Sequence, residues 1–352
     1  MVLSKKVVFR KPREVSIEEE DLPSPSRGQV LIKTLVTLIS AGTELTMLSG
    51  DYPKGSIWSM MNYPCTPGYS NCGIVVEVGE DVKEVNVGDR VLSFAGHSEY
   101  VLVDVDRILA KVPEEVSDEE AAFGTLAATS MNAVRLARIS LGECVVIVGM
   151  GILGQLTAQF CKLSGGFPVI AIDISEKRLE IAKKLGVIVT LNPRRDNVEN
   201  EISFITEGQG ADVVFEVTGS PEVIPWALNL VKPIRNTFPP ESGRPVLGRY
   251  VQLSSPRGPS TIDFHDQVNF PSRIIIGAHE SSHPVFETPY NPWTRRKNIK
   301  LFFELIKAGM VDVKGLVTHK YPLSEAKYVY EKLLDPAKRL NMLGILFDQK
   351  NL

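Results

Sequence analysis

Three glycines, at positions 149, 151 and 154, have the spacing with which a turn between a strand and a helix binds phosphate. They lie in IVGMGILG, which ends the apolar run CVVIVG and opens the helical pattern ILGQLTAQFCKLSG. Gly149 permits a tight turn, Gly151 lets the backbone approach a pyrophosphate, and Gly154 allows close packing of helix on strand. The free N–H groups and the positive dipole at the start of such a helix attract phosphate. The segment therefore predicts a dinucleotide-binding turn made of Gly149, Met150, Gly151, Ile152, Leu153 and Gly154.

Asp173 is the second part of this prediction. It ends the apolar run PVIAID, 19 residues after Gly154. A carboxylate at the end of the second strand accepts hydrogen bonds from both ribose hydroxyls and repels a 2′-phosphate, so it favours NAD(H) over NADP(H) as the cofactor. Lys177 and Arg178 follow closely, and we expect them on the solvated face of a helix rather than at a 2′-phosphate. The alternative is a glycine turn that only packs a helix against a strand.

A second polar group occurs in ISAGTELTMLSG, residues 39–50, where Thr43, Glu44 and Thr46 follow an apolar run. Two hydroxyls and a carboxylate so close together are candidates for an active-site wall. Thr46 follows Thr43 closely, and we expect both on the same turn. Glu44 in such a place is more often a structural acceptor that orients its neighbours.

The composition limits the class of protein and its partners. The chain has 352 residues, a net charge of −3 and 43% apolar residues, which is typical of a soluble globular protein. This charge gives no reason to expect nucleic acid or an anionic membrane as a partner. The apolar runs are too short to span a bilayer, and the N-terminus lacks the apolar core of a secretory signal. The four cysteines form no Cys-x-x-Cys pair, so we expect reduced thiols in a cytoplasmic protein.

Two kinds of hydrophobic pattern divide the chain. Residues 1–118 hold β-branched runs separated by glycine, proline and aspartate, such as QVLIKTLVTLIS and CGIVVEVG, which predict a small barrel or sandwich. Ser117 and Glu120 have the spacing of a capping box at the start of the helix that follows. From about residue 142, strands alternate with helices, and this alternation predicts a parallel sheet covered on both faces.

The order of these blocks, with a C-terminal tail returning to the first, resembles the medium-chain dehydrogenase/reductase family. The motifs that carry the resemblance are PGYSNCGIVVEVGEDV, VNVGDRV, GTLAATSMNAV and FEVTGSPEVIPWAL. It implies an α/β protein with a Rossmann doubly wound parallel sheet in residues 119–283. It also implies a GroES-like β-barrel catalytic domain in residues 1–118, completed by segment 284–352. In the family the FEVTG segment, here with Thr218, closes over the nicotinamide of the cofactor.

The resemblance fails at the zinc ligands of the zinc-containing members. Those members carry Cys-Gly-Ser/Thr-Asp where this chain has Ala41-Gly42-Thr43-Glu44, and Gly-His-Glu where it has Gly68-Tyr69-Ser70. A third ligand, often cysteine, falls at Thr125, and the four-cysteine lobe of a structural zinc is missing after VGDRVLSFAG. Alanine has no donor atom and neutral hydroxyls do not normally bind zinc, so we expect a zinc-free member. SAGTEL and PGYSN are similar to a zinc-free branch that includes hydroxyethyl-bacteriochlorophyllide dehydrogenase-like proteins.

Without a metal, side chains must transfer the alcohol proton and stabilise the developing alkoxide. By resemblance, Tyr69 replaces a metal-binding histidine and Thr43 matches the proton-relay hydroxyl of the family. His97 lies in the short loop FAGHSEY, where the resemblance puts the mouth of the substrate site, and histidine titrates near working pH. The alternative for His97 is a surface or turn histidine. The predicted catalytic residues are therefore Thr43, Glu44, Thr46, Tyr69 and His97.

His279 and His283, in GAHESSHP, are interpreted as contacts with the substrate or with a second subunit. A His-x3-His pair binds metal when it lies on a helix, and Pro284 argues against a helix here. The preceding strand, RIIIG, would be an exposed apolar sheet edge in a monomer. Pairing with its twin in a second copy removes that edge, so we expect a homodimer or homotetramer.

The sequence thus predicts an NAD-dependent, zinc-independent oxidoreductase that moves a hydride between a secondary alcohol and its ketone. The polar candidates favour a hydroxylated small molecule, such as a polyol or sugar derivative, as substrate. Two alternatives stay open. One is NAD(P)H-dependent reduction of an enone or quinone, although such enzymes often use NADPH and lack the carboxylate of Asp173. The other is a non-catalytic NAD(H)-binding sensor or scaffold.

Overall fold

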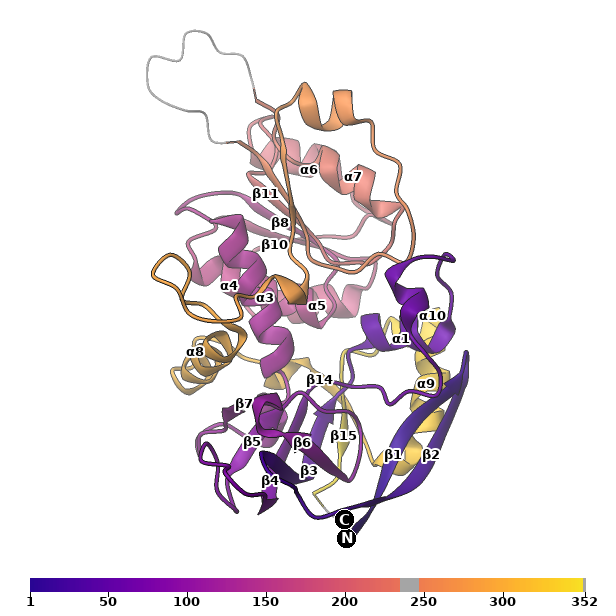
Figure 1. The fold of residues 1–352 in the computed structure, drawn as a ribbon. Coiled ribbons are helices and arrows are strands. Elements are labelled where there is room, and N and C mark those ends of the chain that lie inside the picture. The colour runs from indigo at the N-terminus through magenta and orange to yellow at the C-terminus, as the bar shows by residue number, and fades with distance from the viewer. Residues whose placement is uncertain (235–246, 351–352) are drawn as a thin grey trace. The chain divides into compact units, whose positions relative to one another are not determined.

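A computed structural model describes residues 1–234 and 247–350 of the chain (Figure 1). The chain divides into two compact units, Met1–Ala128 with His283–Leu352, and Thr129–Ser282. The boundary falls inside helix α3 (Gly124–Ala137), so the first unit reaches Ala128 rather than the limit of 118 suggested by the sequence. Of the polar, proline-rich segment 234–246, all but Ile234 lies outside the described residues.

The first unit is built around one sheet of predominantly antiparallel strands. Its order is β14-β15-β3-β4-β5-β7 with β6 beside β3, whereas β1 and β2 form a separate hairpin. β15, from the end of the chain, pairs with β3, so the C-terminal segment completes a sheet that the N-terminal segment begins. The strands are β1 (Val2–Lys11), β2 (Glu14–Leu22), β3 (Gln29–Leu38), β4 (Asn71–Val78), β5 (Arg90–Ser93), β6 (Tyr100–Asp104), β7 (Ile108–Lys111), β14 (Val317–Tyr321) and β15 (Gly344–Asp348).

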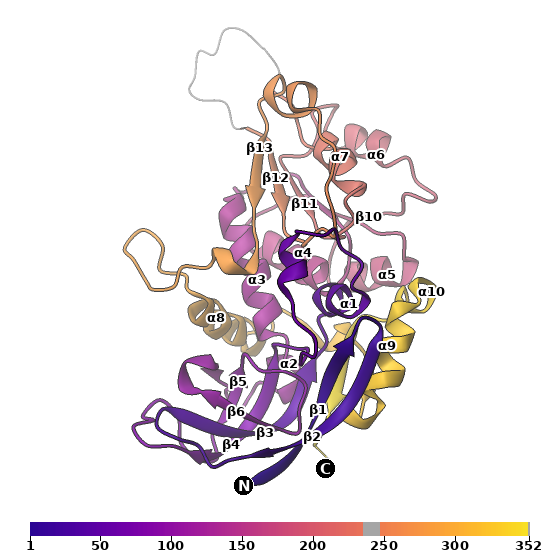
Figure 2. The same cartoon turned by 45° about the vertical axis from the view of Figure 1, so that its right-hand side comes forward.

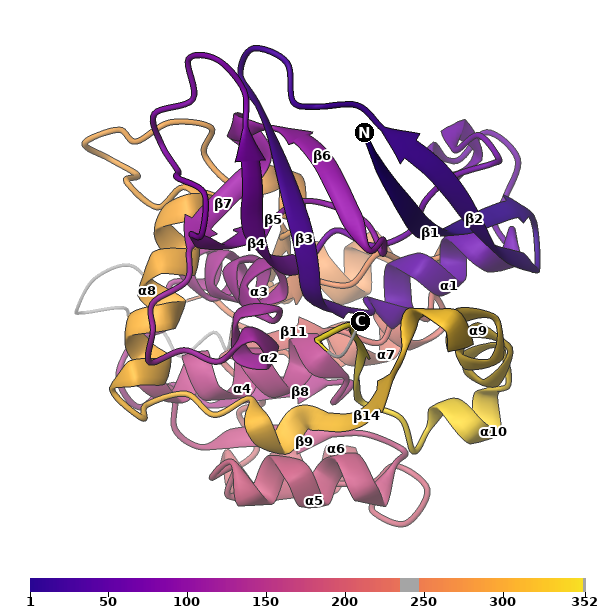
Figure 3. The same cartoon turned by 90° about the horizontal axis from the view of Figure 1, so that it is seen from below.

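The helices of the first unit include one that the sequence analysis missed. Residues expected to form a turn form helix α1 (Ala41–Ser49), which ends at Gly50 in the left-handed conformation. The predicted capping box of Ser117 and Glu120 is confirmed at the start of α2. α1 packs beside α9 in the same unit (Figure 3). The other helices are α2 (Asp118–Ala121), α8 (Arg295–Lys307), α9 (Ala326–Leu334) and α10 (Pro336–Arg339).

The second unit is the predicted doubly wound parallel sheet. Its strands lie in the order β10-β9-β8-β11-β12-β13, and each neighbouring pair is parallel. β11, β12 and β13 lie side by side in Figure 2. The elements are β8 (Val145–Val148), α4 (Ile152–Leu163), β9 (Val169–Ile172), α5 (Glu176–Lys184), β10 (Val189–Leu191), α6 (Val198–Ile205), β11 (Val213–Glu216), α7 (Val223–Asn229), β12 (Arg249–Gln252) and β13 (Ile274–Gly277). None of the described helices is both long and apolar enough to cross a membrane.

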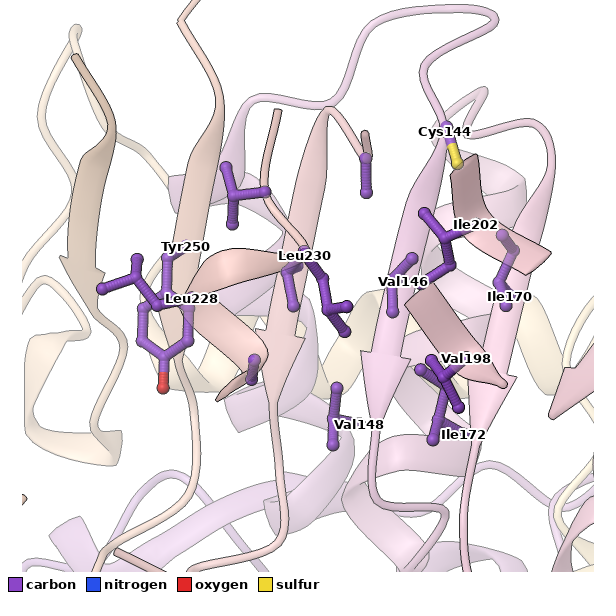
Figure 4. Close-up of a cluster of buried hydrophobic side chains, with 14 of the residues drawn as sticks. Cys144, Val146, Val148, Ile170, Ile172, Val198, Ile202, Leu228, Leu230 and Tyr250 are labelled. Carbon is purple, nitrogen blue, oxygen red and sulfur yellow. The ribbon is translucent and has the colours of Figure 1, made fainter. Parts of the chain in front are cut away.

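One face of this sheet is buried under α6 and α7 (Figure 4). Val198 and Ile202 of α6 pack with Val146 of β8 and Ile172 of β9 in one apolar cluster, and all four are almost fully buried. β8, with the run VVIV, is buried at every position, which is typical of a parallel strand covered on both faces. This packing fixes the carboxyl ends of the strands, where ligands bind in folds of this kind.

Candidate functional site

The glycine turn lies between β8 and α4, as the spacing of the glycines predicted. A Cβ atom added to Gly154 would lie 2.0 Å from the carbonyl oxygen of Gly149, so only glycine fits this close approach. Gly151 immediately precedes α4, and a Cβ atom there would meet no atom within 4 Å. The space at the start of this helix is therefore open, and the backbone of the turn fits the phosphates of a dinucleotide.

Asp173 directly follows β9 and is tied to the glycine turn. One carboxylate oxygen accepts a 2.7 Å hydrogen bond from the Met150 N–H, and the other accepts one of 2.8 Å from the Ser175 N–H. A guanidinium nitrogen of Arg178 lies 3.8 Å from the Asp173 carboxylate, and only 18% of the Arg178 side chain is exposed. The expectation that Arg178 lies on a solvated helix face is therefore wrong, since its charge is directed at Asp173.

Thr218 lies two residues beyond the end of β11 and next to the same glycine turn. A Cβ atom added to Gly149 would be 3.0 Å from the backbone nitrogen of Thr218. The hydroxyl and N–H groups of Thr218 both donate to the carboxylate of Glu216, a buried residue that the sequence analysis did not select. The structure thus brings Gly149, Met150, Asp173 and Thr218 together at the carboxyl end of one sheet.

In the first unit, the hydroxyl of Tyr69 is the centre of a polar group at the start of α1. It donates a hydrogen bond to Ser40 Oγ and lies 3.5 Å from Thr43 Oγ1. The ring of Tyr69 stacks on Phe94, with 5.6 Å between the ring centroids. Burial raises the pKa of Tyr69, although its two hydroxyl partners act in the opposite direction. The phenol is therefore protonated at neutral pH and is available as a proton donor.

The side chains at the zinc-ligand positions of the resemblance do not fit a zinc ion. Ala41 carries no donor atom, and the Tyr69 hydroxyl is bonded to Ser40. Thr125 is fully buried, and its hydroxyl accepts a 3.0 Å hydrogen bond from Ser70. Within residues 1–234 and 247–350, no three His, Cys, Asp or Glu side chains are grouped as metal ligands would be. Neutral hydroxyls engaged with one another are a poor match for the anionic or imidazole donors that zinc prefers.

His97 and Glu44 lie in the interior of the first unit and not at an exposed mouth. Both side chains are fully buried, and His97 Nε2 lies 3.1 Å from the Glu44 carboxylate. The Glu44 carboxylate also accepts hydrogen bonds from the Ser40 N–H at 2.7 Å and from the Tyr330 hydroxyl at 2.5 Å. His97 Nδ1 lies 2.7 Å from the hydroxyl of Thr37. The sequence placed His97 in an open loop because the interior partner of that loop was not visible in the sequence.

The same histidine explains the glycine that precedes Tyr69. Gly68 has a φ of +94°, and a Cβ atom there would lie 2.8 Å from Nε2 of His97. The His97 ring therefore packs directly on the backbone that carries Tyr69. We revise His97 from a proton-transfer residue to one that, together with Glu44, holds the Tyr69 segment and the start of α1 in place.

Thr46 and the two later histidines are also placed differently from the predictions. The Thr46 hydroxyl is buried and donates to the Gly42 carbonyl of its own helix at 2.8 Å, so it is not a partner of Thr43. His279 is exposed, and its ring bonds to Ser281. His283 is buried with Nε2 3.1 Å from the Ala128 carbonyl oxygen, and burial lowers its pKa. His283 is thus a structural donor in the first unit.

Sequence comparison identifies the family of the chain. A family model described as the alcohol dehydrogenase GroES-like domain matches residues 26–114, and one described as zinc-binding dehydrogenase matches residues 153–234. The chain belongs to the medium-chain dehydrogenase/reductase superfamily. Within it, the protein is an alcohol dehydrogenase-like oxidoreductase. The zinc-binding dehydrogenase match does not include positions 41, 69 and 125, so it carries no information about the donor set.

Relatives in this superfamily match over most of the chain. An L-threonine 3-dehydrogenase of Pyrococcus horikoshii is 29% identical over 86% of this chain and 87% of its own. An erythritol/L-threitol dehydrogenase of Mycolicibacterium smegmatis is 25% identical over 94% of this chain and 92% of its own. The crystal structure of 2R,3R-butanediol dehydrogenase from Bacillus subtilis has a TM-score of 0.77 at 26% identity, covering 98% of this chain and 99% of that chain.

Ser40 is the functional candidate that sequence reasoning missed. It immediately precedes α1, where a serine usually caps the helix with its side chain. Here the Ser40 side chain instead accepts from Tyr69, and Glu44 reaches back to the Ser40 N–H. The signal in the sequence was the pair Ser40 and Glu44. A capping box has its glutamate three residues after the serine, and here the glutamate comes four residues after it.

We expect Tyr330→Phe to destabilise the protein by about 1–3 kcal/mol, because it removes one donor from a buried carboxylate. Burial and the Glu44 charge both raise the pKa of Tyr330, so its hydroxyl stays protonated and continues to donate. Urea unfolding measures the change. Tyr321→Phe on β14, where the ring stacks on His319, is the control and should change stability by less than about 0.5 kcal/mol. Equal changes in the two variants would contradict the assigned role of Tyr330.

Proposed function

We propose that this superfamily member moves a hydride between a nicotinamide dinucleotide and a secondary alcohol or its ketone, without zinc. The observation that carries the proposal is the Tyr69 phenol, bonded to Ser40 and close to Thr43, at a position where the zinc-containing members have a metal ligand. The hydroxyl group replaces the function of a Lewis acid with a hydrogen bond to the reacting oxygen.

The proton chemistry is clearest in the direction of ketone reduction. The cofactor, when bound, supplies the hydride that adds to the carbonyl carbon. Negative charge then develops on the carbonyl oxygen, and Tyr69 donates its proton to that oxygen as the alcohol forms. The solvent then returns a proton to the tyrosinate, and the hydroxyls of Ser40 and Thr43 relay it. Because burial raises the pKa of Tyr69, this donor stays protonated throughout the neutral range.

NAD(H) is the cofactor that the second unit supports better. The Asp173 carboxylate lies beside the glycine turn, where it can accept from ribose hydroxyls and where it repels a 2′-phosphate. Arg178, 3.8 Å away, offsets part of this negative charge. We therefore propose that the protein prefers NAD(H) to NADP(H). This preference is weaker than it would be if Asp173 had no arginine beside it.

Hydroxylated small molecules are the substrate class that we propose. The relatives are named for L-threonine, for erythritol and L-threitol, and for 2R,3R-butanediol. Each of these compounds carries a secondary alcohol next to another polar group. The Ser40, Thr43 and Tyr69 hydroxyls offer matching donors and acceptors to such a substrate.

Tyr69→Phe should lower the kcat of ketone reduction by about 10²-fold or more, as expected for loss of a general acid. The reaction is followed by NADH absorbance with a chelator present, using a panel of polyols, sugar derivatives, secondary alcohols and their ketones. Tyr321→Phe, in the same unit, is the control and should keep full activity. The wild-type rate of reduction should fall only as the pH rises above the ordinary tyrosine range, since the donor is protonated below its raised pKa.

Other outcomes of this assay point to other functions. Activity that appears only after zinc is added would overturn the metal-free proposal. Turnover of enones or quinones with NADPH, and none of alcohols or ketones, would favour the alkene-reducing class. Saturable NADH binding with no turnover of any substrate would favour a binding-only role.

Asp173→Ala should weaken NAD⁺ binding by about tenfold and leave NADP⁺ binding equal or stronger, because the ribose acceptor and its repulsive charge are both removed. Isothermal titration calorimetry measures both dissociation constants. Asp196→Asn is a control in the same unit, since that carboxylate pairs with Arg195 and accepts from the Asn192 N–H. A parallel loss of NAD⁺ and NADP⁺ binding would contradict the role of Asp173 in cofactor choice.

We propose that β13 pairs with its twin in a second copy of the chain. β13 is at the edge of the described sheet, and Ile274 and Ile275 on it are 40% and 41% exposed. Ile275→Lys should shift the protein toward monomers in size-exclusion chromatography with light scattering, because an edge lysine opposes strand pairing. Val76→Lys on β4 of the other unit is the control, with 37% exposure. An unchanged mass for Ile275→Lys would exclude this interface.

A further inference from the structure

A second buried carboxylate, that of Glu216, ends β11 and is not used by the proton chemistry above. It is fully buried and surrounded by donors. One oxygen accepts from the Thr218 N–H at 2.7 Å and from the Thr218 hydroxyl. The other accepts from the Gln252 amide at 2.7 Å and from the Ser254 hydroxyl. Four hydrogen-bond donors around one carboxyl group favour its ionised form. The ionised group is a fixed negative charge in a region of low dielectric.

This charge lies at the point of the sheet where dinucleotides bind. The strand order runs outward from β8 to β10 in one direction and from β11 to β13 in the other, so it reverses between β8 and β11. Ligands of such sheets bind across the carboxyl ends at this reversal, one half of the dinucleotide on each side. Asp173 follows β9, on the side that takes the adenosine half. The ends of β11 and β12 therefore face the nicotinamide half.

Two cations of this sheet, Lys232 and Arg249, are engaged at the amino end of the strands. Lys232 pairs with Asp212, which precedes β11, and Arg249, which opens β12, pairs with Glu143. At the carboxyl end, Tyr250 donates to Gln252, and Gln252 donates to Glu216. Burial and the charge of Glu216 both raise the pKa of Tyr250, so this chain of donors ends in a protonated phenol.

We propose that Glu216 is the positioning residue of the nicotinamide half-site, where it fixes Thr218 and Ser254 and its charge favours the oxidised cofactor over the reduced one. The inference rests on the proposed nicotinamide cofactor. The oxidised ring is a cation and the reduced ring is neutral, so a fixed anion on this side of the sheet attracts only the oxidised form. The same charge stabilises the cation that develops as a hydride leaves the reduced ring, which assists ketone reduction.

The test compares three ligands in wild type and Glu216→Gln by isothermal titration calorimetry: NAD⁺, NADH and ADP-ribose. Removal of the charge should weaken NAD⁺ binding by about tenfold and NADH binding by about twofold. ADP-ribose, which lacks the nicotinamide, should bind unchanged. Equal loss for NAD⁺ and NADH would overturn the charge effect, and loss of ADP-ribose binding would show a general distortion of the glycine turn instead.

Two further variants keep the proposal testable if Glu216→Gln does not fold. Thr218→Val keeps the carboxylate and removes one oriented hydroxyl, so it should weaken NAD⁺ and NADH equally, with ADP-ribose unaffected. Unchanged binding of all three ligands would contradict the positioning role. Tyr250→Phe keeps the charge and should keep the ratio of NAD⁺ to NADH affinity. If the wild-type protein bound no dinucleotide, the proposed function itself would be refuted. This outcome distinguishes a failure of the proposed function from a failure of the inference about Glu216.

Discussion

The first unit depends on one interaction, the burial of the Glu44 carboxylate. A carboxylate removed from water is stable only when donors surround it. Those donors come from three parts of the chain: the Ser40 N–H just before α1, His97 in the loop between β5 and β6, and Tyr330 on α9. The N-terminal and C-terminal segments are thus joined at one charged group. The start of α1, with Ser40 and Thr43, is held in place as a consequence, and so is the hydroxyl of Tyr69.

The two units use the same physical device near their functional groups. Glu44 sets the start of α1, and Glu216 sets the residues that follow β11 and β12. In both cases a buried anion accepts from backbone and side-chain donors, and hydroxyl-bearing residues are fixed around it. Such a network is sensitive to the loss of any one donor, because the remaining charge is left under-compensated in a medium of low dielectric.

The sequence predicted most of the second unit and less of the first. Alternating apolar runs and helical patterns identified the Rossmann sheet, and the Ser117 capping box was confirmed. α1 was missed because the segment ISAGTELTMLSG contains glycine and threonine, which have low helix propensity. Tertiary contacts of Glu44 stabilise this helix instead. The predicted location of His97, at the mouth of the substrate site, was wrong for a similar reason. Its partner lies 53 positions earlier, and no local pattern indicates such a pairing.

The distances around Tyr69 indicate how hydroxyls would replace a metal. Ser40, which the sequence analysis did not select, is the close partner of the phenol, whereas Thr43 lies 3.5 Å away, at the limit of a hydrogen bond. A bound metal ion holds its ligands in a fixed arrangement. A group of hydroxyls has no such central ion, so the surrounding fold must hold the hydroxyls in place. Under the proposed zinc-free chemistry, the buried contacts of Glu44, His97 and Gly68 would meet that requirement. Catalytic hydrogen bonds often tighten only when substrate binds, and a looser contact to Thr43 leaves room for a substrate oxygen to compete for the same phenol.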